Sequence, residues 1–424
     1  MQMLSMPTSL FENHAIDNKM RFLFYCHDTY GLGHIRRALS LAAHFTETMP
    51  NAEVLIVTGS PFAHSFALPP RVDYVKLPAV TKTNTGAYHA RSFDLDFSAI
   101  RDLRASILRE TARGFRPDVF LVDHAPQGLK GEALSTLAML KYTQPECLRV
   151  LGLRDIVDSR DVIQKTWNKE GIYQTLEQDY DLILVYGSRG LYDVAQEYNL
   201  PASVDRRVRY CGYLDRVANM EVTPTSSSRP LVVLTAGGGG DGFPIMRDYL
   251  IGLRQLTDIP FDSVLLTGPL MDDAEQSELR GLTAFLPADK IRIESFMPDP
   301  LPLLRSADLV VAMAGYNTTC ELLALKQRML LVPRIIPRKE QLIRASILSQ
   351  HGLAQMLSPE DMTPESLIAS VQRALLQPRP TADQLAETGI SFDGQASARD
   401  AILEAMELRN AQPWAIQRLV ENVA

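Results

Sequence analysis

The feature that most constrains the fold is an alternation of short apolar segments with helical segments, which occurs twice along the chain. In the first half, the expected strands cover residues 21–26, 52–59, 73–79, 119–124, 148–155, 182–188 and 208–214. In the second half, they cover 231–237, 263–269, 291–296, 309–315, 328–333 and 353–358. Nearly continuous apolar strands separated by helices indicate parallel sheets that are covered on both faces.

The two alternating halves are separated by a Thr/Ser/Pro-rich stretch, residues 218–230, which has no hydrophobic period and is typical of a linker. A chain of 424 residues also fits two domains. We therefore predict an α/β protein with two Rossmann-like, doubly wound domains facing across a cleft. The predicted division is a poorly ordered leader, an N-terminal Rossmann-like domain, the linker, a C-terminal Rossmann-like domain and a helical tail, which cover residues 1–19, 20–217, 218–230, 231–395 and 396–424.

Composition excludes several classes of protein. The formal net charge of −7 argues against a nucleic-acid-binding protein. Four scattered cysteines are typical of buried packing residues in a reducing cytoplasm. The first residues lack the apolar core of a signal peptide, and no apolar run reaches the length of about 18 residues that a membrane helix needs. Metal-binding motifs are absent from the sequence, so we expect neither a metal nor a cofactor.

The loop after the first strand contains Gly31, Gly33 and His34. Its glycines allow a ligand to approach the backbone closely. The helix that follows directs its N-terminus at the cleft, which disfavours an added positive charge on the imidazole. A neutral imidazole is the form that a general base needs, so His34 is our first catalytic candidate. The alternative is that His34 only caps the helix.

A second loop contains four successive glycines, Gly237, Gly238, Gly239 and Gly240, between a strand and a helix. Consecutive glycine amides before a helix N-terminus can bind a diphosphate through the backbone. The alternative is a flexible turn between the strand and the helix.

Two later segments contain polar residues that could bind a sugar nucleotide. After Gly315, either Asn317 or Thr318 can cap a helix in which Glu321 could bind a ribose diol. At the next helix start, Glu340 and Gln341 could bind sugar hydroxyls. The alternatives are a first-turn glutamate on a surface helix and a solvated helix start.

Strand ends supply the remaining candidates. Asp123, His124 and Asp155 lie where strands of the first half end, so they are expected to face the cleft. Asp123 is a candidate either for a base or for a partner that orients His34. His89, in a long polar loop, is a candidate acceptor contact, like His124 and Asp155.

Together these motifs resemble the GT-B glycosyltransferases, and among them the MurG branch (family 28). The likeness covers residues 20–380 and rests on four sets of residues: Gly31, Gly33 and His34; Gly237–Gly240; Gly315 and Glu321; and Pro333, Glu340, Gln341 and Ala345. The chain is most similar to MurG relatives described only as predicted glycosyltransferases. It departs from MurG at Arg344, where MurG usually has an asparagine.

The resemblance implies a cytoplasmic hexosyltransferase that builds a polysaccharide or glycoconjugate and inverts the sugar without a metal. The implied donor is a UDP-sugar, with UDP-GlcNAc a candidate, and the acceptor is a glycan, a lipid-linked molecule or a small molecule. The implied donor site has Glu321 at the ribose, Glu340 and Gln341 at the sugar, and Phe296 and Met297 at the base. Peripheral contact at the inner face of the membrane is compatible with a lipid acceptor. A UDP-sugar 2-epimerase and a non-catalytic nucleotide-sugar-binding protein are the alternatives.

Overall fold

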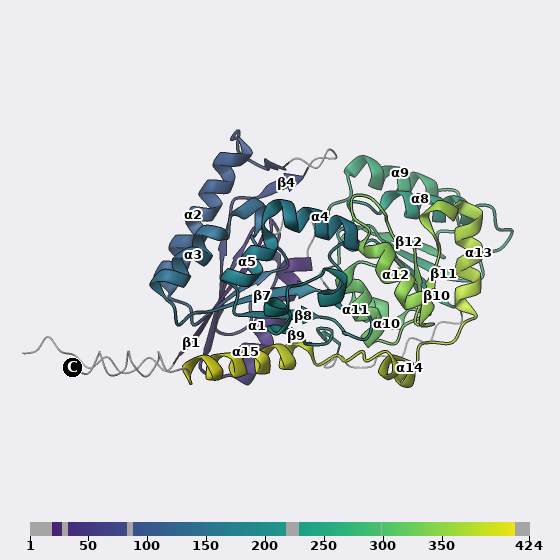
Figure 1. The fold of residues 1–424 in the computed structure, drawn as a ribbon. Coiled ribbons are helices and arrows are strands. Elements are labelled where there is room, and N and C mark those ends of the chain that lie inside the picture. Colours follow the sequence, from purple (N-terminus) through teal and green to yellow (C-terminus); the bar gives the residue numbers. More distant parts are fainter. Residues whose placement is uncertain (1–18, 28–32, 83–87, 218–228, 298, 412–424) are drawn as a thin grey trace, which may run out of the picture.

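A computed structural model describes residues 19–27, 33–82, 88–217, 229–297 and 299–411. These residues form two α/β domains that lie side by side (Figure 1). The predicted leader and linker lie almost entirely outside the described residues, as does Gly31.

The N-terminal domain is built on a seven-stranded parallel sheet with the order β3-β2-β1-β6-β7-β8-β9. Its strands are β1 (Met20–Cys26), β2 (Ala52–Thr58), β3 (Val72–Lys76), β6 (Val119–Asp123), β7 (Leu148–Arg154), β8 (Leu182–Tyr186) and β9 (Val208–Tyr210). A hairpin of β4 (Val80–Lys82) and β5 (Tyr88–Ala90) was not predicted. The helices are α1 (Gly33–Thr48), η1 (Ala63–Ser65), α2 (Phe97–Phe115), η2 (Leu129–Gly131), α3 (Leu134–Thr143), α4 (Arg160–Glu170), α5 (Ile172–Asp179), α6 (Val194–Glu197) and α7 (Ala202–Asp205).

The C-terminal domain is built on a six-stranded parallel sheet with the order β12-β11-β10-β13-β14-β15. Its strands are β10 (Leu231–Thr235), β11 (Asp262–Leu266), β12 (Ile291–Glu294), β13 (Leu309–Ala312), β14 (Met329–Leu331) and β15 (Gln355–Met356). Its helices are α8 (Phe243–Leu253), α9 (Asp273–Thr283), α10 (Leu301–Ser306), α11 (Tyr316–Ala324), α12 (Glu340–Gln350), η3 (Pro359–Asp361) and α13 (Pro364–Leu375). Every strand predicted from the apolar pattern is present, mostly one to four residues shorter than expected.

The strand order explains where the site forms. In the first sheet the order reverses between β1 and β6, and in the second it reverses between β10 and β13. Ligands of doubly wound sheets bind at such switch points, outside the carboxyl ends of the strands. His34 follows β1 and Asp123 ends β6, while the glycine loop follows β10 and Gly315 follows β13.

The last helices connect the two domains a second time. The α14 helix (Ala382–Glu387) lies under the C-terminal domain, and α15 (Gly394–Asn410) packs back against α1 and β8 of the N-terminal domain (Figure 1). The Gln395 amide donates to Ser40 Oγ over 3.0 Å, and its oxygen accepts from the backbone amide of Asp215 over 3.0 Å. The described part of the predicted tail, residues 396–411, therefore lies along the N-terminal domain.

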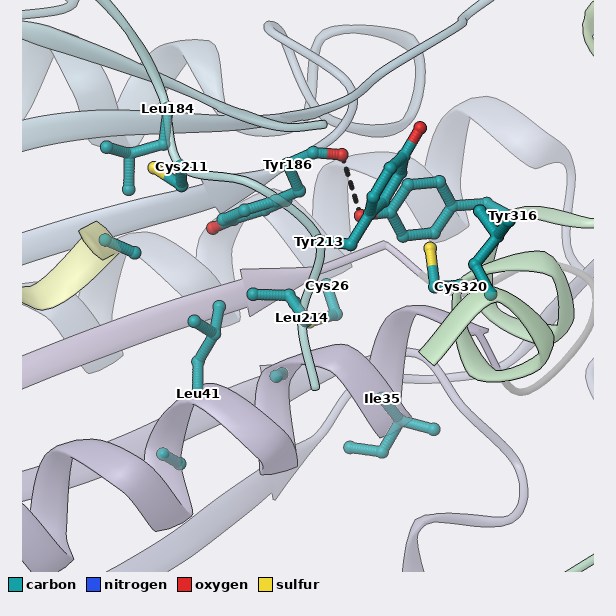
Figure 2. Close-up of a cluster of buried hydrophobic side chains, with 14 of the residues drawn as sticks. Cys26, Ile35, Leu41, Leu184, Tyr186, Cys211, Tyr213, Leu214, Tyr316 and Cys320 are labelled. Carbon is teal, nitrogen blue, oxygen red and sulfur yellow. Dashed lines mark hydrogen bonds between the residues drawn. The ribbon is translucent and has the colours of Figure 1, made fainter. Parts of the chain in front are cut away.

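A buried tyrosine cluster joins the two cores. Tyr186 and Tyr213 of the N-terminal domain pack with Tyr316 of α11, and the Tyr316 hydroxyl donates to the Tyr186 carbonyl over 2.8 Å (Figure 2). Cys26, Cys211 and Cys320 lie in the same cluster, and Cys147 is buried elsewhere. All four cysteines are buried and none of them forms a disulfide, which confirms their prediction as packing residues.

Candidate active site

His34 and Asp123 meet at the switch point of the first sheet. The His34 Nδ1 atom is hydrogen-bonded to Asp123 Oδ2, although the two residues are far apart in the sequence. Arg37, one helical turn after His34, donates from Nε and Nη2 to the two oxygens of the same carboxylate, each over 2.7 Å. Burial favours a raised pKa for Asp123, but Arg37 and His34 outweigh it and hold this pKa well below its usual range.

This contact decides between the two roles predicted for Asp123. Its two oxygens bind His34 and Arg37, so the carboxylate orients the imidazole. A carboxylate bonded to one ring nitrogen leaves the other free for a substrate and stabilises the imidazolium that forms when it takes a proton. The geometry is that of a general base with its orienting partner, which goes beyond helix capping.

A side chain of the C-terminal domain contacts the segment that carries His34. Asn317 of α11 donates from Nδ2 to the Gly33 carbonyl over 3.1 Å, and its Oδ1 lies 3.5 Å from Arg37 Nη1. The prediction that Asn317 or Thr318 caps α11 is wrong, because the cap residue is Gly315 and no side chain bonds there. Asn317 instead connects the C-terminal domain to Gly33 and Arg37, on either side of His34.

Five residues of the predicted donor site line one small cavity. They are Gly237, Phe296, Met297, Thr318 and Glu321, and Arg36 of the N-terminal domain joins them. The cavity holds about 40 Å³, whereas ligand sites usually hold about 300–1,000 Å³. At this volume the cavity is smaller than a nucleotide sugar needs.

Glu321 is buried and forms an ion pair with Arg216, which lies just before the linker. This contradicts the alternative of a surface helix. Burial raises the pKa of the Glu321 carboxyl, partly offset by the nearby Arg216 and Arg36. The carboxylate predicted to bind a ribose is thus already held by an arginine of the other domain.

The glycine loop has a defined backbone conformation. Gly239 has a φ of 97°, and an added Cβ would lie 2.1 Å from the Thr267 carbonyl oxygen. The Leu270 amide donates to the Gly238 carbonyl over 2.9 Å, and the Gly242 amide to the Gly239 carbonyl over 3.0 Å. In the part of the chain that the structure describes, the amides of Gly238 and Gly240 donate to no acceptor, so both are available to an anion.

Glu340 and Gln341 begin α12 and are both buried, so the alternative of a solvated helix start is wrong. Arg334 organises them: its Nη2 lies 3.1 Å from Glu340 Oε1, and its backbone amide donates to Gln341 Oε1 over 3.1 Å. Arg334 also pairs with Asp241, which joins this loop to the glycine loop. Burial raises the pKa of Glu340, but Arg334 outweighs it and the net shift is downward.

We expected Asp155 to lie open to an acceptor, but its carboxylate is already paired. Arg344 of α12 donates from Nη2 to Asp155 Oδ1 over 2.7 Å, and the Tyr213 hydroxyl donates to Oδ2 over 3.1 Å. Both partners of the ion pair are buried, and Arg344 also donates to the Ala314 carbonyl over 2.8 Å. Asp155 therefore ties the domains together, and Arg344, where MurG usually has an asparagine, supplies the bond.

The other predicted acceptor contacts have different environments. His124 is buried with a φ of 67° and hydrogen-bonds Arg154 through its ring. Burial and the nearby Arg154 lower its pKa well below the usual value, so its ring is neutral. His89 is exposed on β5, and nothing in the structure connects it with His34.

A second cavity, of about 820 Å³, adjoins the donor cavity, with which it shares Pro269 and Phe296. Its other lining residues belong to the N-terminal domain and include Phe62, His64, Lys76, Arg91 and Phe93. Its size suits a small organic ligand. Sequence reasoning missed it, because its lining comes from segments that are far apart in the chain.

The described residues contain neither a cluster of metal-binding side chains nor a membrane-spanning helix. Among them, no three histidine, cysteine or carboxylate side chains are grouped as a metal ion would require. None of the helices that the structure describes is both long and apolar enough to cross a bilayer.

Sequence comparisons connect these features to known proteins. Residues 234–400 match the glycosyltransferase family 28 C-terminal domain. An uncharacterized glycosyltransferase of Methanosarcina acetivorans is 25% identical, covering 89% of this chain and 96% of the relative. The UDP-N-acetylglucosamine–N-acetylmuramyl-(pentapeptide) pyrophosphoryl-undecaprenol N-acetylglucosamine transferase of an Exiguobacterium species is 27% identical over 42% of this chain and 46% of the relative.

Solved structures share the fold across nearly the whole chain. The MurG of Acinetobacter baumannii superposes with a TM-score of 0.52 at 13% identity, covering 91% of this chain and 99% of the other. A putative UDP-N-acetylglucosamine 2-epimerase of Listeria monocytogenes superposes with a TM-score of 0.61 at 13% identity, covering 93% and 97%. Structural likeness at such low identity shows only the fold, whereas the sequence matches are to glycosyltransferases. The chain is therefore a MurG-like glycosyltransferase of the GT-B fold, with a family 28 C-terminal domain.

Proposed function

We propose that this enzyme transfers a sugar from a UDP-sugar to an acceptor hydroxyl, with inversion and without a metal, and that His34 is the base. The observation that carries the proposal is the His34–Asp123–Arg37 arrangement at the switch point, held against the donor domain by Asn317. Displacement at the anomeric carbon needs a base for the acceptor proton and stabilisation of the leaving diphosphate. His34 supplies the first, and the free amides of the glycine loop supply part of the second.

The proposed donor site starts from the residues that line the smaller cavity and extends to the neighbouring loops. Glu321 binds the ribose, Phe296 and Met297 lie at the base, Gly237–Gly240 and Gly315 bind the diphosphate, and Glu340 and Gln341 bind the sugar. The names of the bacterial relatives contain UDP-N-acetylglucosamine, which supports a UDP-sugar as the donor. Because Asp241 and Arg334 pair across the site, the diphosphate and sugar portions of the donor would be bound by adjacent loops.

The acceptor occupies the larger cavity in this proposal. Its apolar lining includes Phe62 and Phe93, and Phe93 is 54% exposed. The side chain of Phe93 is therefore available to a ligand that carries an apolar portion, which a lipid-linked acceptor has. Gly33, which begins the helix of the base, would lie at the acceptor hydroxyl.

A panel of nucleotides and nucleotide sugars tests the donor site by thermal shift. A ligand that binds only the folded protein raises its midpoint of unfolding by mass action. We expect UDP and at least one UDP-sugar to raise the midpoint, and Glu321→Gln to reduce this shift. If no nucleotide shifts the wild-type protein, the donor assignment fails.

Turnover separates transfer from the alternatives. A transferase releases UDP from its donor only when an acceptor is present, and His34→Ala abolishes that release. An epimerase would convert UDP-GlcNAc to its 2-epimer without an acceptor. A protein that only binds nucleotide sugars would release no UDP with any acceptor, and His34→Ala would leave its nucleotide binding unchanged. Addition of EDTA to the transfer assay tests the absence of a metal requirement.

A further inference from the structure

Two arginines from opposite domains, Arg154 and Arg338, lie near the buried ring of His124, and among the described residues neither forms an ion pair. The centroid of the His124 ring lies 5.7 Å from that of the His34 ring. Arg154 ends β7 and hydrogen-bonds only the neutral ring of His124. Arg338 lies in the loop before α12, and among the described residues its side chain forms neither a hydrogen bond nor an ion pair. Both side chains are partly buried.

The neighbouring charges are already paired. Arg37 binds Asp123, Arg344 binds Asp155, and Arg334 binds Asp241 and Glu340. Of the carboxylates that the structure describes, none forms an ion pair with Arg154 or Arg338. Arg154 and Arg338 are therefore left without an ion-pair partner where the loop before α12 meets the N-terminal domain, since the Lys339 amide donates to Asp158 Oδ1 there over 3.0 Å.

The electrostatic field at Arg154 reflects this surplus. Burial and the neighbouring Arg37 and Arg338 lower the pKa of Arg154 to about 9, with Glu340 acting in the opposite direction, so the guanidinium is still charged at neutral pH. Unpaired like charges in a partly desolvated site repel one another, and an anion between them would relieve the repulsion. Guanidinium groups bind phosphate and carboxylate oxygens through charge-assisted hydrogen bonds.

We propose that Arg154 and Arg338 form a clamp, one arm from each domain, that binds an oxyanion of the substrate beside His34. The inference rests on the proposed function, because that function supplies the substrates. The loop that carries Arg338 is joined to the glycine loop through the Arg334–Asp241 pair, so the oxyanion we favour is the leaving diphosphate of the donor. A carboxylate on the transferred sugar has the same chemistry and is the second source.

Inorganic pyrophosphate tests the clamp without relying on a nucleotide. We would measure its binding by calorimetry to the wild type, Arg154→Gln, Arg338→Gln and Arg280→Gln. Arg280 lies exposed on α9, and its variant changes the net charge by the same amount. We expect about a tenfold loss of affinity for each clamp variant and less than about a twofold loss for the control. Equal affinities across the four proteins, or no binding to the wild type, would overturn the proposal.

Thermal unfolding of the ligand-free proteins separates binding from a structural role. If Arg154 is there to bind a ligand, Arg154→Gln removes repulsion, so the midpoint of unfolding stays the same or rises while affinity falls. If Arg154 only supports the fold, the midpoint falls and pyrophosphate affinity does not change. That second pattern would contradict the clamp.

Ligand pairs identify the source of the oxyanion. If the clamp binds the diphosphate, the variants lose about tenfold in affinity for UDP and none for uridine. If it binds a sugar carboxylate, they keep their affinity for UDP and lose the wild-type preference for UDP-glucuronate over UDP-glucose. Should neither pair distinguish the variants from wild type, the clamp is refuted. Should pyrophosphate bind through the clamp while no nucleotide binds, the proposed function fails and the clamp stands.

Discussion

The two domains contribute different kinds of chemical groups to the candidate active site. In the N-terminal domain the site consists of charged side chains that bind one another, as in His34, Asp123 and Arg37. In the C-terminal domain the loop proposed to bind the diphosphate consists of glycine backbone, with Gly239 in a conformation that other residues rarely adopt. The side chains of the first half are fixed by ion pairs, and the amides of the second are fixed by backbone geometry. The two therefore respond to mutation in different ways.

The largest effect is expected for the side chains of the N-terminal domain that are proposed to act in catalysis. His34→Ala removes the base and should lower the rate of transfer by at least about 10²-fold, while UDP still raises the midpoint of unfolding. Asp123→Asn keeps the imidazole but loses the charge that orients it, so its rate should fall to an intermediate value. Rates of UDP release with acceptor, measured beside nucleotide binding, check both expectations. A His34→Ala enzyme of full activity would place the base elsewhere.

The next largest effect concerns the Arg344–Asp155 ion pair, which joins the two domains. Arg344→Gln leaves the buried Asp155 carboxylate without its charged partner, which typically costs about 3–5 kcal/mol. Urea unfolding measures this loss. Arg399→Gln breaks a surface pair with Asp400 and is the matched control, with an expected cost below about 1 kcal/mol. Equal costs for the two variants would show that the Arg344–Asp155 pair does not hold the domains together.

Two glycines of the loop after β10 test the part of the site that is formed by backbone. Gly239→Ala puts a Cβ against the Thr267 carbonyl at a φ of 97°, which should destabilise the protein by about 2 kcal/mol or more and weaken UDP binding. Gly237→Ala, with a φ of 63° and open space around its Cβ, should cost only about 1 kcal/mol. Urea unfolding and UDP titration of both variants give the comparison. Similar results for the two would mean that close packing does not shape this loop.

A smaller effect is expected at the Arg216–Glu321 pair, where the halves meet over the donor cavity. Arg216→Gln would free the Glu321 carboxylate for the proposed ribose contact, so affinity for UDP should rise by a few fold. The ligand-free protein should become less stable by about 1–3 kcal/mol, because a buried carboxylate loses its hydrogen-bonding partner. UDP titration and urea unfolding measure the two quantities. A fall in UDP affinity would mean that Arg216 contacts the nucleotide itself.

The smallest effect is a difference in pH dependence. His27 and His124 have pKa values well below the usual one because they are buried, so the folded protein binds fewer protons than the unfolded chain below a pH of about 6.5. The free energy of unfolding should therefore decline as the pH falls from 6.5. Asp123, with its depressed pKa, contributes stability above about pH 4 that is lost below it. Urea unfolding of His124→Gln should show a shallower decline between pH 6.5 and 5 than wild type, and an identical decline would contradict this account.

The comparison between the halves also explains what could be predicted. The glycine loop was found directly from the sequence, because four adjacent glycines between a strand and a helix are a recognisable pattern of an anion-binding loop. Glu321, Glu340 and Gln341 were found through a family resemblance, yet their burial and their arginine partners were not. The bond between His34 and Asp123 was left open, because a sequence does not state which strand ends are adjacent until the strand order is known.

By itself, the sequence determined the two parallel sheets, nearly all of their strands, and the loops from which the site is built. Local patterns decide these features, since periodicity and glycine placement act over a few residues. Only the tertiary structure decided the pairing of Arg37, Arg344 and Arg216 with their carboxylates, the small donor cavity, and the two arginines left without partners. These depend on contacts between residues far apart in the chain, whose geometry is set when the sheets assemble and the domains close on each other.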